Sequence, residues 1–421
     1  MIDLDLLRNE ATRKQTLDLL MKRGVTQETV EALLTADKNW IAYSEKLDSL
    51  RSKKKQASEQ IATASAQEKQ TIIASMQALG NEEASLTEQV ETAAQERDSL
   101  WRSIPNVPLP DVQVGGEKDS EVIATSTTPV LGSSDTPLDY MTLMGSRIDM
   151  ERGAKVAGAR FTYISGDVAR MELALASFIM DTLTKEGFTQ VIPPLLLQEQ
   201  AMAGMGYLDQ AGDEVYKTQD DLYLVGTSEQ SLGVMHMDEI LDRKTLPLRY
   251  VAFTPCFRRE AGSHGKDVKG ILRLHQFDKV EMFSITDPAS SQQEHEFLLQ
   301  KQRDIMDALA LPYRVVRLAA GDIGQPSAKT YDIETWIPSE QTYRETHSTS
   351  NTTDYQSRRL NIRTKAEDGS TQKVHMLNGT AVALSRLLIA LIENHQQPDG
   401  SVAIPNCLHS YLPFTTLAAN S

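Results

Sequence analysis

The chain has 421 residues, of which 40% are hydrophobic and 24% charged, and a formal net charge of −15 at pH 7. This length predicts two or three domains, and the acidic balance argues against DNA binding, although a local basic patch can still hold a specific RNA. Cys256 and Cys407 are the two cysteines, which argues against a disulfide framework or a thiolate zinc site. With neither a secretory leader nor an apolar run of about eighteen residues, we expect a cytoplasmic protein without a membrane span.

Residues 1–25 are expected to form a helical lead-in that ends near Gly24. Residues 27–104 then carry apolar or small residues at heptad spacing, in two series that break around 65–68. Two such helices joined by a short polar link predict an antiparallel coiled-coil hairpin. Its first helix, 27–64, is about 55 Å long at about 1.5 Å per residue, so the arm should project from a compact domain.

The arm also carries a basic cluster on an otherwise acidic chain, and Lys54 of this cluster occupies a seam position. Heptads most commonly serve a structural or dimerising role, and charge runs are usually solvated faces. The alternative is an arm that holds an extended RNA. Taken alone, the residues leave both interpretations open. The cluster consists of Arg51, Lys53, Lys54 and Lys55.

A proline-rich linker at 105–110 separates this helical domain, 1–104, from a second domain, 105–421. Helices set apart from runs of strand predict an α+β fold there, with an antiparallel sheet flanked by helices. The sequence has no P-loop and no strand-linked G-x-G-x-x-G, so the usual phosphate cradles are missing. We expect helices at 166–185 and 380–396 and strands at 188–192, 222–226, 248–257, 272–285, 313–318, 331–337 and 343–350.

The most informative stretch is the hairpin predicted over 248–285. Arg258 ends its first strand, Glu260 follows, and three glycines occur in the loop. In the second strand, period-two alternation places Phe277 and Glu281 on one face. A half-buried strand also shows a polar face to water, but an aromatic ring, charges and flexible backbone together suit a nucleotide. That face carries Arg273, His275, Phe277, Lys279 and Glu281.

Three further patches combine hydroxyls, carboxylates and an arginine. Thr227-Ser228-Glu229 follows a strand, where it can cap the next helix or grip an ammonium group. The stretch 343–351 is rich in hydroxyls, as a wet sheet face also is. The patch 377–380 precedes a helix with Arg386 in its early part, which indicates a bound phosphate or a solvated side chain. Together the four patches suit phosphoryl or adenylyl transfer.

On these residues the chain resembles the seryl-tRNA synthetase family of the common bacterial and eukaryotic type, a class II aminoacyl-tRNA synthetase. TPCFRREAGSHGKDVKGILRLHQFDKVEMF resembles motif 2, GTAVALSRLLIALIENHQQPDG resembles motif 3, and GFTQVIPPLLL resembles motif 1 at the dimer interface. With the arm, the resemblance covers nearly the whole chain. It implies activation of L-serine by ATP to seryl-adenylate and pyrophosphate, then transfer of serine to the 3′ end of a serine tRNA or also of a selenocysteine tRNA.

The resemblance also implies residue roles. Arg258 and Arg386 would be catalytic, Phe277 would stack on adenine, and Glu345 and Ser348 would bind Mg²⁺, with no zinc expected. The implied ATP-binding residues are Arg258, Arg259, Glu260, Phe277, Glu345, Thr346, His347, Ser348 and Arg386. The implied serine-binding residues are Thr227, Ser228, Glu229, Arg258, Glu281, Asn378 and Thr380. Arg51, Lys53, Lys54 and Lys55 would contact the tRNA.

A homodimer is implied as well, in which the arm of one subunit reaches the tRNA bound to the other. The loop glycines at 262, 265 and 270 would leave room for the acceptor end of the tRNA. Two other interpretations stay open. One is an amino-acid:carrier-protein ligase, which has a similar core, and the other is a catalytically inactive paralogue.

Selection of serine has a physical rationale under this resemblance. Glu281 paired with Thr380 would reject alanine and glycine, because an unpaired buried polar group costs roughly 1–3 kcal/mol. A tight wall would reject threonine by sterics. Ser228 and His347 depart from the residues that are frequent in the family, which bears on the geometry of the serine and ATP sites.

Overall fold

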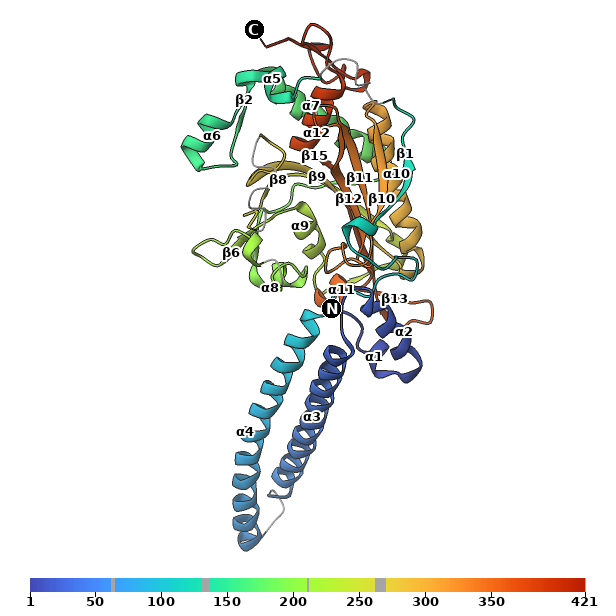
Figure 1. The fold of residues 1–421 in the computed structure, drawn as a ribbon. Coiled ribbons are helices and arrows are strands. Elements are labelled where there is room, and N and C mark those ends of the chain that lie inside the picture. The colour runs from blue at the N-terminus through green and yellow to red at the C-terminus, as the bar shows by residue number, and fades with distance from the viewer. Residues whose placement is uncertain (62–64, 130–136, 210–211, 262–269, 421) are drawn as a thin grey trace. The chain divides into compact units, whose positions relative to one another are not determined.

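The computed structural model describes residues 1–61, 65–129, 137–209, 212–261 and 270–420. These form two compact units, one of Ile2–Pro105 and one of Met1 with Asn106–Ser421. Figure 1 shows that the first is helical and the second is built on a sheet. The predicted end of the first arm helix at 64 and the loop glycines Gly262 and Gly265 lie outside the described residues.

The lead-in is two helices rather than the single helix expected. Asn9 separates them with an extended backbone, and its side chain caps the second helix by accepting a hydrogen bond from the backbone N–H of Ala11 at 3.0 Å. Gly24 follows with a φ of 78°, a conformation that favours glycine beyond a helix end. The helical unit consists of α1 (Asp5–Arg8), α2 (Glu10–Met21), α3 (Gln27–Ile61) and α4 (Ala66–Ser103).

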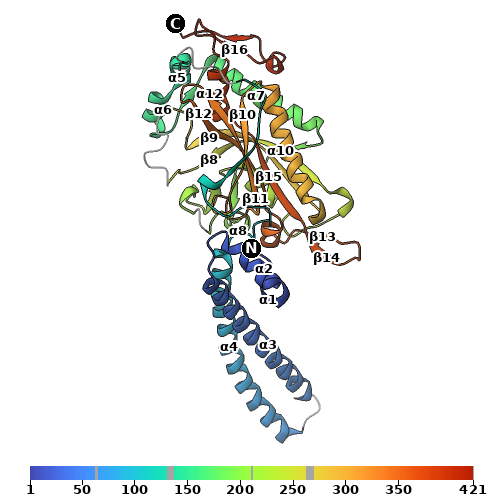
Figure 2. The same ribbon diagram turned by 45° about the vertical axis from the view of Figure 1, so that its right-hand side comes forward.

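Helices α3 and α4 run antiparallel beside each other, which confirms the predicted hairpin (Figures 1 and 2). Polar side chains of α3 form ion pairs with a glutamate of α4. Lys54 Nζ lies 2.6 Å from Glu83 Oε2, and Arg51 Nε lies 3.2 Å from Glu83 Oε1. Further from the hairpin turn, the Arg97 guanidinium lies 3.9 Å from the centre of the Trp40 ring. Such pairs favour one register of the two helices.

The second unit is built on an eight-stranded sheet, as the predicted α+β fold requires. Its strands pair antiparallel except for β4 and β8, which are parallel. Antiparallel neighbours bring side chains from distant parts of the chain face to face. Across the sheet the order is β1 (Glu121–Thr125), β10 (Tyr313–Arg317), β11 (Lys329–Ile337), β12 (Thr342–Asn351), β15 (His375–Ala383), β9 (Gln276–Thr286), β8 (Leu248–Phe257) and β4 (Thr189–Gln190).

Helices α7 (Gly166–Lys185), α10 (Ser291–Ala308) and α12 (Leu384–Asn394) contact the strands of this sheet, and α7 and α12 contact each other (Figure 2). Their apolar faces close the core. A shorter helix, α9 (Ser228–Val234), contacts β8 and β9. The fully buried core residues include Leu175, Ile179, Leu298, Met306 and Leu388. Among the described residues, no helix has both the length and the apolar character to cross a bilayer.

Smaller elements complete this unit. The remaining helices are α5 (Tyr140–Met144), α6 (Met150–Ala157), α8 (Glu199–Gly204) and α11 (Tyr355–Arg359), with short 3₁₀ turns at Glu117–Asp119, Gly145–Arg147, Gly212–Glu214, Arg243–Thr245, Pro288–Ser290 and Asn406–Leu408. The remaining strands are β2 (Ile148–Asp149), β3 (Tyr163–Ile164), β5 (Leu196–Gln198), β6 (Leu222–Leu224), β7 (Ile240–Leu241), β13 (Arg363–Lys365), β14 (Thr371–Lys373), β16 (Val402–Ala403) and β17 (Thr416–Leu417).

The closing segment differs from its prediction. The helix expected from residue 380 begins at Leu384, and the residues before it form β15 between β12 and β9. A Cβ on Gly379 would lie 3.0 Å from Thr349 Oγ1 and 3.2 Å from Met282 Cε. Glycine is therefore favoured here because side chains of both neighbouring strands pack closely against it, and not because the chain turns.

The second strand of the hairpin is also shorter than predicted, because β9 begins at Gln276 rather than at 272. Just before it, the backbone N–H of His275 donates to the oxygen of Arg160, a residue outside the hairpin, at 3.0 Å. The strand expected at 188–192 is likewise reduced to Thr189–Gln190. The alternation of Phe277 and Glu281 survives because both residues lie within β9.

Candidate active site

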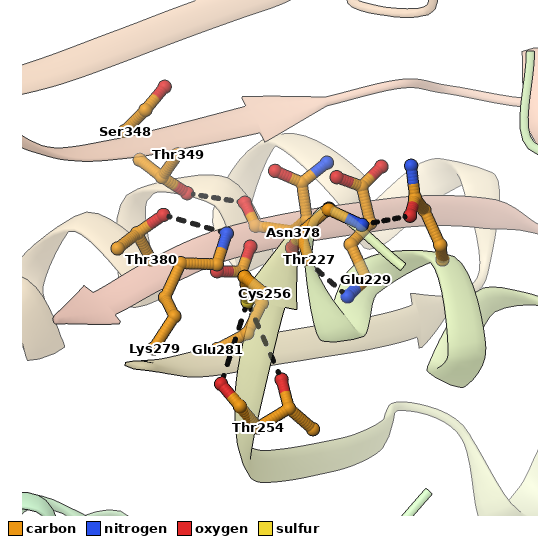
Figure 3. A network of polar contacts seen from close by, with 12 residues as sticks. Thr227, Glu229, Thr254, Cys256, Lys279, Glu281, Ser348, Thr349, Asn378 and Thr380 are labelled. Atoms are coloured by element: carbon orange, nitrogen blue, oxygen red, sulfur yellow. Dashed lines mark hydrogen bonds and ion pairs between the residues drawn. The ribbon is translucent and has the colours of Figure 1, made fainter. Parts of the chain in front are cut away.

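A cavity of about 870 Å³, here called the large cavity, is lined by side chains of β9, β11, β12 and β15 together with residues of α9. Figure 3 shows several of these side chains converging. The predicted site residues that line it are Thr227, Glu229, Arg258, Glu281, Glu345, Ser348, Asn378 and Thr380. All four polar patches of the sequence therefore contribute to one cavity.

A second cavity of about 50 Å³, here called the small cavity, adjoins the first. Arg258, Lys279, Glu345 and Thr380 line both. The further predicted residues in its lining are Glu260, Phe277, Thr346 and Arg386. The aromatic residue expected to stack on a base thus lies beside the arginines expected to face phosphates.

Arg258 lies where the two cavities adjoin. It follows β8, where its backbone N–H donates to the oxygen of His275 at 2.9 Å, and its Nε donates to the oxygen of Gly226 at 3.2 Å. Its guanidinium carbon lies 5.3 Å from the centre of the Phe277 ring, within the range of a cation–π contact. This positive charge is held where a nucleotide phosphate would accept hydrogen bonds from it.

Glu229 is a buried carboxylate anchored by two donors. The Tyr207 hydroxyl lies 2.7 Å from its Oε2, and Gln356 Nε2 lies 2.9 Å from its Oε1. Thr227 caps α9 by accepting a hydrogen bond from the Glu229 backbone N–H at 3.2 Å, and it also lines the large cavity. A carboxylate has about four acceptor sites, so Glu229 retains capacity for an ammonium group.

Lys279 and Glu281 form a buried ion pair, with Nζ 2.6 Å from Oε2 and residue exposures of 5% and 1%. Lys279 also donates to Thr380 Oγ1 at 3.5 Å (Figure 3). Strand pairing explains the grouping, because Thr380 of β15 lies opposite Glu281 of β9. Burial raises the pKa of Glu281, and the Lys279 ammonium opposes this rise.

Strands β11 and β12 contribute acidic side chains to the large cavity. Arg386 Nη1 lies 3.1 Å from Glu345 Oε1 and donates to the backbone oxygen of Glu345 at 3.0 Å. Asp332 lies opposite Ser348 in the strand pairing, and its buried Oδ1 has no hydrogen-bond partner among the described residues. Burial, and then the Glu345 carboxylate, raises the pKa of Asp332 well above its ordinary value. This set of oxygens suits a hard cation.

Three residues implied in substrate binding lie outside both cavity linings, and their roles, like those of the lining residues, stay predictions. Ser228 is fully buried in α9. His347 is 1% exposed, its Nδ1 lies 2.8 Å from Thr346 Oγ1, and burial lowers its pKa to about 4. Arg259 lines a separate cavity of about 620 Å³ together with Tyr216.

Sequence reasoning placed Lys279 on the polar face of the hairpin but gave it no role in the site, and it did not single out Tyr207 or Asp332; all three line the large cavity. A site role for Lys279 could have been inferred, because it shares its strand parity with Phe277 and Glu281. Tyr207 and Asp332 belong to no recognisable motif. They reach the cavity only because distant segments of the chain come together.

The basic cluster of the arm is divided by its contacts. Arg51 and Lys54 are ion-paired with Glu83, whereas Lys53 and Lys55 have exposed side chains. The exposed pair is available to a phosphate backbone, while the other two also contribute to the pairing of α3 with α4.

The mixed sheet with its helical cover and two adjoining cavities is that of a class II aminoacyl-tRNA synthetase, and residues 214–395 match the family model of the tRNA synthetase class II core domain (G, H, P, S and T). Residues 1–108 match the model of the seryl-tRNA synthetase N-terminal domain. The chain is 43% identical over 415 residues to the serine–tRNA ligase of Thermobifida fusca, covering 98% of this chain and 97% of that one. It belongs to the seryl-tRNA synthetase family.

Further relatives agree along the whole chain. Identity to the serine–tRNA ligase of Acidothermus cellulolyticus is 44% over 420 residues, 98% of each chain. Among solved structures, the seryl-tRNA synthetase from Pyrococcus horikoshii complexed with ATP has a TM-score of 0.91 and 35% identity, covering all of both chains. The predicted fold and the predicted function, charging of a serine tRNA, are confirmed, and neither alternative interpretation is favoured.

Proposed function

We propose that the two cavities carry out both chemical steps of serine tRNA charging. In the first step, a carboxylate oxygen of serine attacks the α-phosphorus of ATP and pyrophosphate leaves. In the second, a hydroxyl at the 3′ end of the tRNA attacks the carbonyl carbon of seryl-adenylate and AMP leaves. The position of Arg258 supports this proposal most directly, because it contacts the Phe277 ring and lines both cavities.

Serine would occupy the large cavity. Its ammonium group would meet Glu229 and Thr227, and its hydroxyl would meet Glu281 and Thr380, with Asn378 in the wall. Because Glu281 is 1% exposed, water could not replace the serine hydroxyl, and alanine would leave one acceptor position of this carboxylate unfilled. Discrimination against amino acids without a hydroxyl would follow from this cost.

ATP would place its adenine against Phe277 in the small cavity, near Glu260 and Thr346. Its phosphates would extend between Arg258 and Arg386. Negative charge that develops at the α-phosphate would face guanidinium groups already held in place. Positioning and electrostatic stabilisation would therefore supply most of the catalysis, without a covalent enzyme intermediate.

Mg²⁺ would be held by Glu345 and Ser348 beside the phosphates. The residues fit a hard cation, since Asp332 next to Ser348 keeps a buried oxygen without a hydrogen-bond partner among the described residues. Within the described residues, no group of three or more aspartate, glutamate, histidine or cysteine side chains could hold a metal ion. Phosphate oxygens would supply the remaining ligands, and the bound ion would neutralise phosphate charge.

The helical arm would bind the tRNA, chiefly through the exposed Lys53 and Lys55 of the basic cluster. We also propose a homodimer in which this arm serves the tRNA of the partner subunit. Apolar side chains in and near motif 1 support a covered surface, because Leu173 is 61% exposed and Ile192 is 100% exposed. Analytical ultracentrifugation should show a dimer for the unaltered chain. The I192D variant should show a larger fraction of monomer at the same concentration.

A cytoplasmic location is proposed for the same protein. Both cysteines are free thiols, Cys256 buried and Cys407 partly buried, as is usual in a reducing compartment. Fractionation of cells that express the full chain checks this location.

Serine-dependent exchange of pyrophosphate into ATP tests the proposed roles. R258A should lose at least about 100-fold in exchange rate, the usual effect of removing a donor that stabilises the transition state. R152A is the matched control, because Arg152 is 75% exposed and pairs with Asp149. Exchange that persists in R258A would sink the proposed site, and charging of purified serine tRNA separates this activity from that of a carrier-protein ligase.

A further inference from the structure

The ion pair between Lys279 and Glu281 is unusual for its burial. The two side chains are 6% and 2% exposed. Burying a lysine and a glutamate costs roughly as much desolvation energy as their attraction returns, so stability alone is a weak reason for this pair. Lys279 also lines both cavities, which places it at the junction of the proposed serine and nucleotide sites.

Glu281 needs such a partner because of its surroundings. Burial is the largest cause that raises its pKa, and the Glu229 carboxylate of α9 raises it further, while Lys279 and a hydrogen bond with Thr380 lower it. Two other titratable groups nearby, Tyr207 and Cys256, are neutral at pH 7, because their ordinary pKa values lie above 7 and burial raises each pKa further. They cannot offset the charge of a buried carboxylate.

The geometry of the pair also restricts where Glu281 can point. Lys279 Nζ lies 2.6 Å from Glu281 Oε2 and 3.5 Å from Thr380 Oγ1, so one ammonium group contacts both residues proposed to meet the serine hydroxyl (Figure 3). Because the three lie on the adjacent strands β9 and β15, none of these contacts depends on a loop.

We propose that Lys279 is a positioning residue that holds Glu281 as a carboxylate aimed at the serine hydroxyl, and so sets the selection of serine. This inference rests on the proposed role of Glu281. A neutral, protonated Glu281 could donate its proton but would accept the serine hydroxyl less well, and it would tolerate alanine better.

The test compares K279M with K279R and the unaltered chain. In K279M, kcat/KM for serine in pyrophosphate exchange should fall about 100-fold at neutral pH. The acidic limb of its pH profile should move up by at least about one pH unit, because Glu281 loses the positive charge beside it. The ratio of serine to alanine activation should fall as well. K279R keeps the charge and should restore the position of the limb. Thermal melts followed by circular dichroism confirm that each variant is folded.

Replacement of Glu281 distinguishes the two possible roles of Lys279. E281Q lacks this carboxylate, so its pH profile of kcat/KM for serine should lack the acidic limb due to Glu281. The double variant E281Q/K279M should therefore have the same pH profile as E281Q. If K279M lowers kcat equally at every pH with no shift of the limb, Lys279 contacts the reacting groups directly and the inference is overturned. If E281Q itself leaves serine selection unchanged, the proposed function of Glu281 fails instead, and the two failures are distinguishable.

Discussion

The hydroxyl of Tyr207 lies 2.7 Å from Oε2 of Glu229, a contact that joins the segment after α8 to the first turn of α9. Together with Gln356, which donates to the other oxygen at 2.9 Å, it anchors the Glu229 carboxylate in the lining of the large cavity. The recognition of the serine ammonium group should therefore depend on a residue that no motif contains.

Y207F should raise the KM for serine by about 10-fold or more, because a hydrogen bond to a charged group contributes about 1.5–3 kcal/mol. The KM for ATP should change little. Pyrophosphate exchange at varied serine concentrations measures this effect. Y411F is the matched control, since Tyr411 donates a similar hydrogen bond of 2.9 Å to the exposed Asp181. An unchanged KM for serine in Y207F would show that Glu229 does not need this anchor.

Phe277 should matter to ATP and not to serine. F277A removes the stacking surface, so the KM for ATP should rise about 5-fold or more, as loss of stacking on a base costs about 1–3 kcal/mol. F277Y keeps the ring and should stay near the unaltered value. Exchange at varied ATP and varied serine separates the two constants. An equal rise in both would point to a general disturbance of Arg258, whose guanidinium lies 5.3 Å from the ring centre.

The arm should be required for charging alone. Deletion of residues 40–95 should spare adenylate formation and abolish transfer to tRNA, because both cavities are formed by the other unit. Exchange and charging assays on the same preparation measure this. Charging at the normal rate after the deletion would contradict a role for the arm in RNA binding.

Within the basic cluster, the two pairs should behave differently. K53A/K55A should weaken tRNA binding and reduce its salt dependence without affecting the helices. R51A/K54A should also lower the thermal stability of the arm, because Glu83 loses both partners. Filter binding at several salt concentrations and circular dichroism melts check this. K244A/K365A, which alters exposed lysines of the other unit, is the control, and an equal loss of stability in both arm variants would refute the division.

Glu172 of α7 should make the free energy of unfolding depend on pH. Burial, and then the Asp278 carboxylate, raises its pKa from 4.5 to about 7. Between these values the native state binds more protons than the unfolded state, so the free energy of unfolding falls as pH rises. E172Q removes this loss. It should melt about 2–4 °C above the unaltered chain near pH 8 and at the same temperature near pH 4, below the pKa of the unfolded state.

Thermal melts of E151Q supply the control for this comparison, because Glu151 is exposed and its replacement should shift the midpoint at neither pH. If the melting midpoints of E172Q and the unaltered chain differ by the same amount near both pH values, packing and not titration is responsible for the difference.

Local periodicity made much of this protein predictable. The heptads of residues 27–104 required only their own spacing to indicate an antiparallel hairpin. The alternation of Phe277 and Glu281 placed both on one face, since a strand repeats every two residues whatever surrounds it. Motif residues such as Arg258 also indicated the chemistry, because their types match phosphate and carboxylate groups.

Contacts between distant segments decided the rest. Asn378-Gly379 has the local signature of a turn, and only close packing by Thr349 and Met282 shows why a glycine stands in a central strand. The environment of Lys279 depends on the register of β9 against β15, which the sequence of neither strand determines by itself. Periodicity is a property of one segment, whereas burial and partner choice arise only when several segments meet, so the sequence alone determined the elements and motif residues and the tertiary structure decided how the site is held.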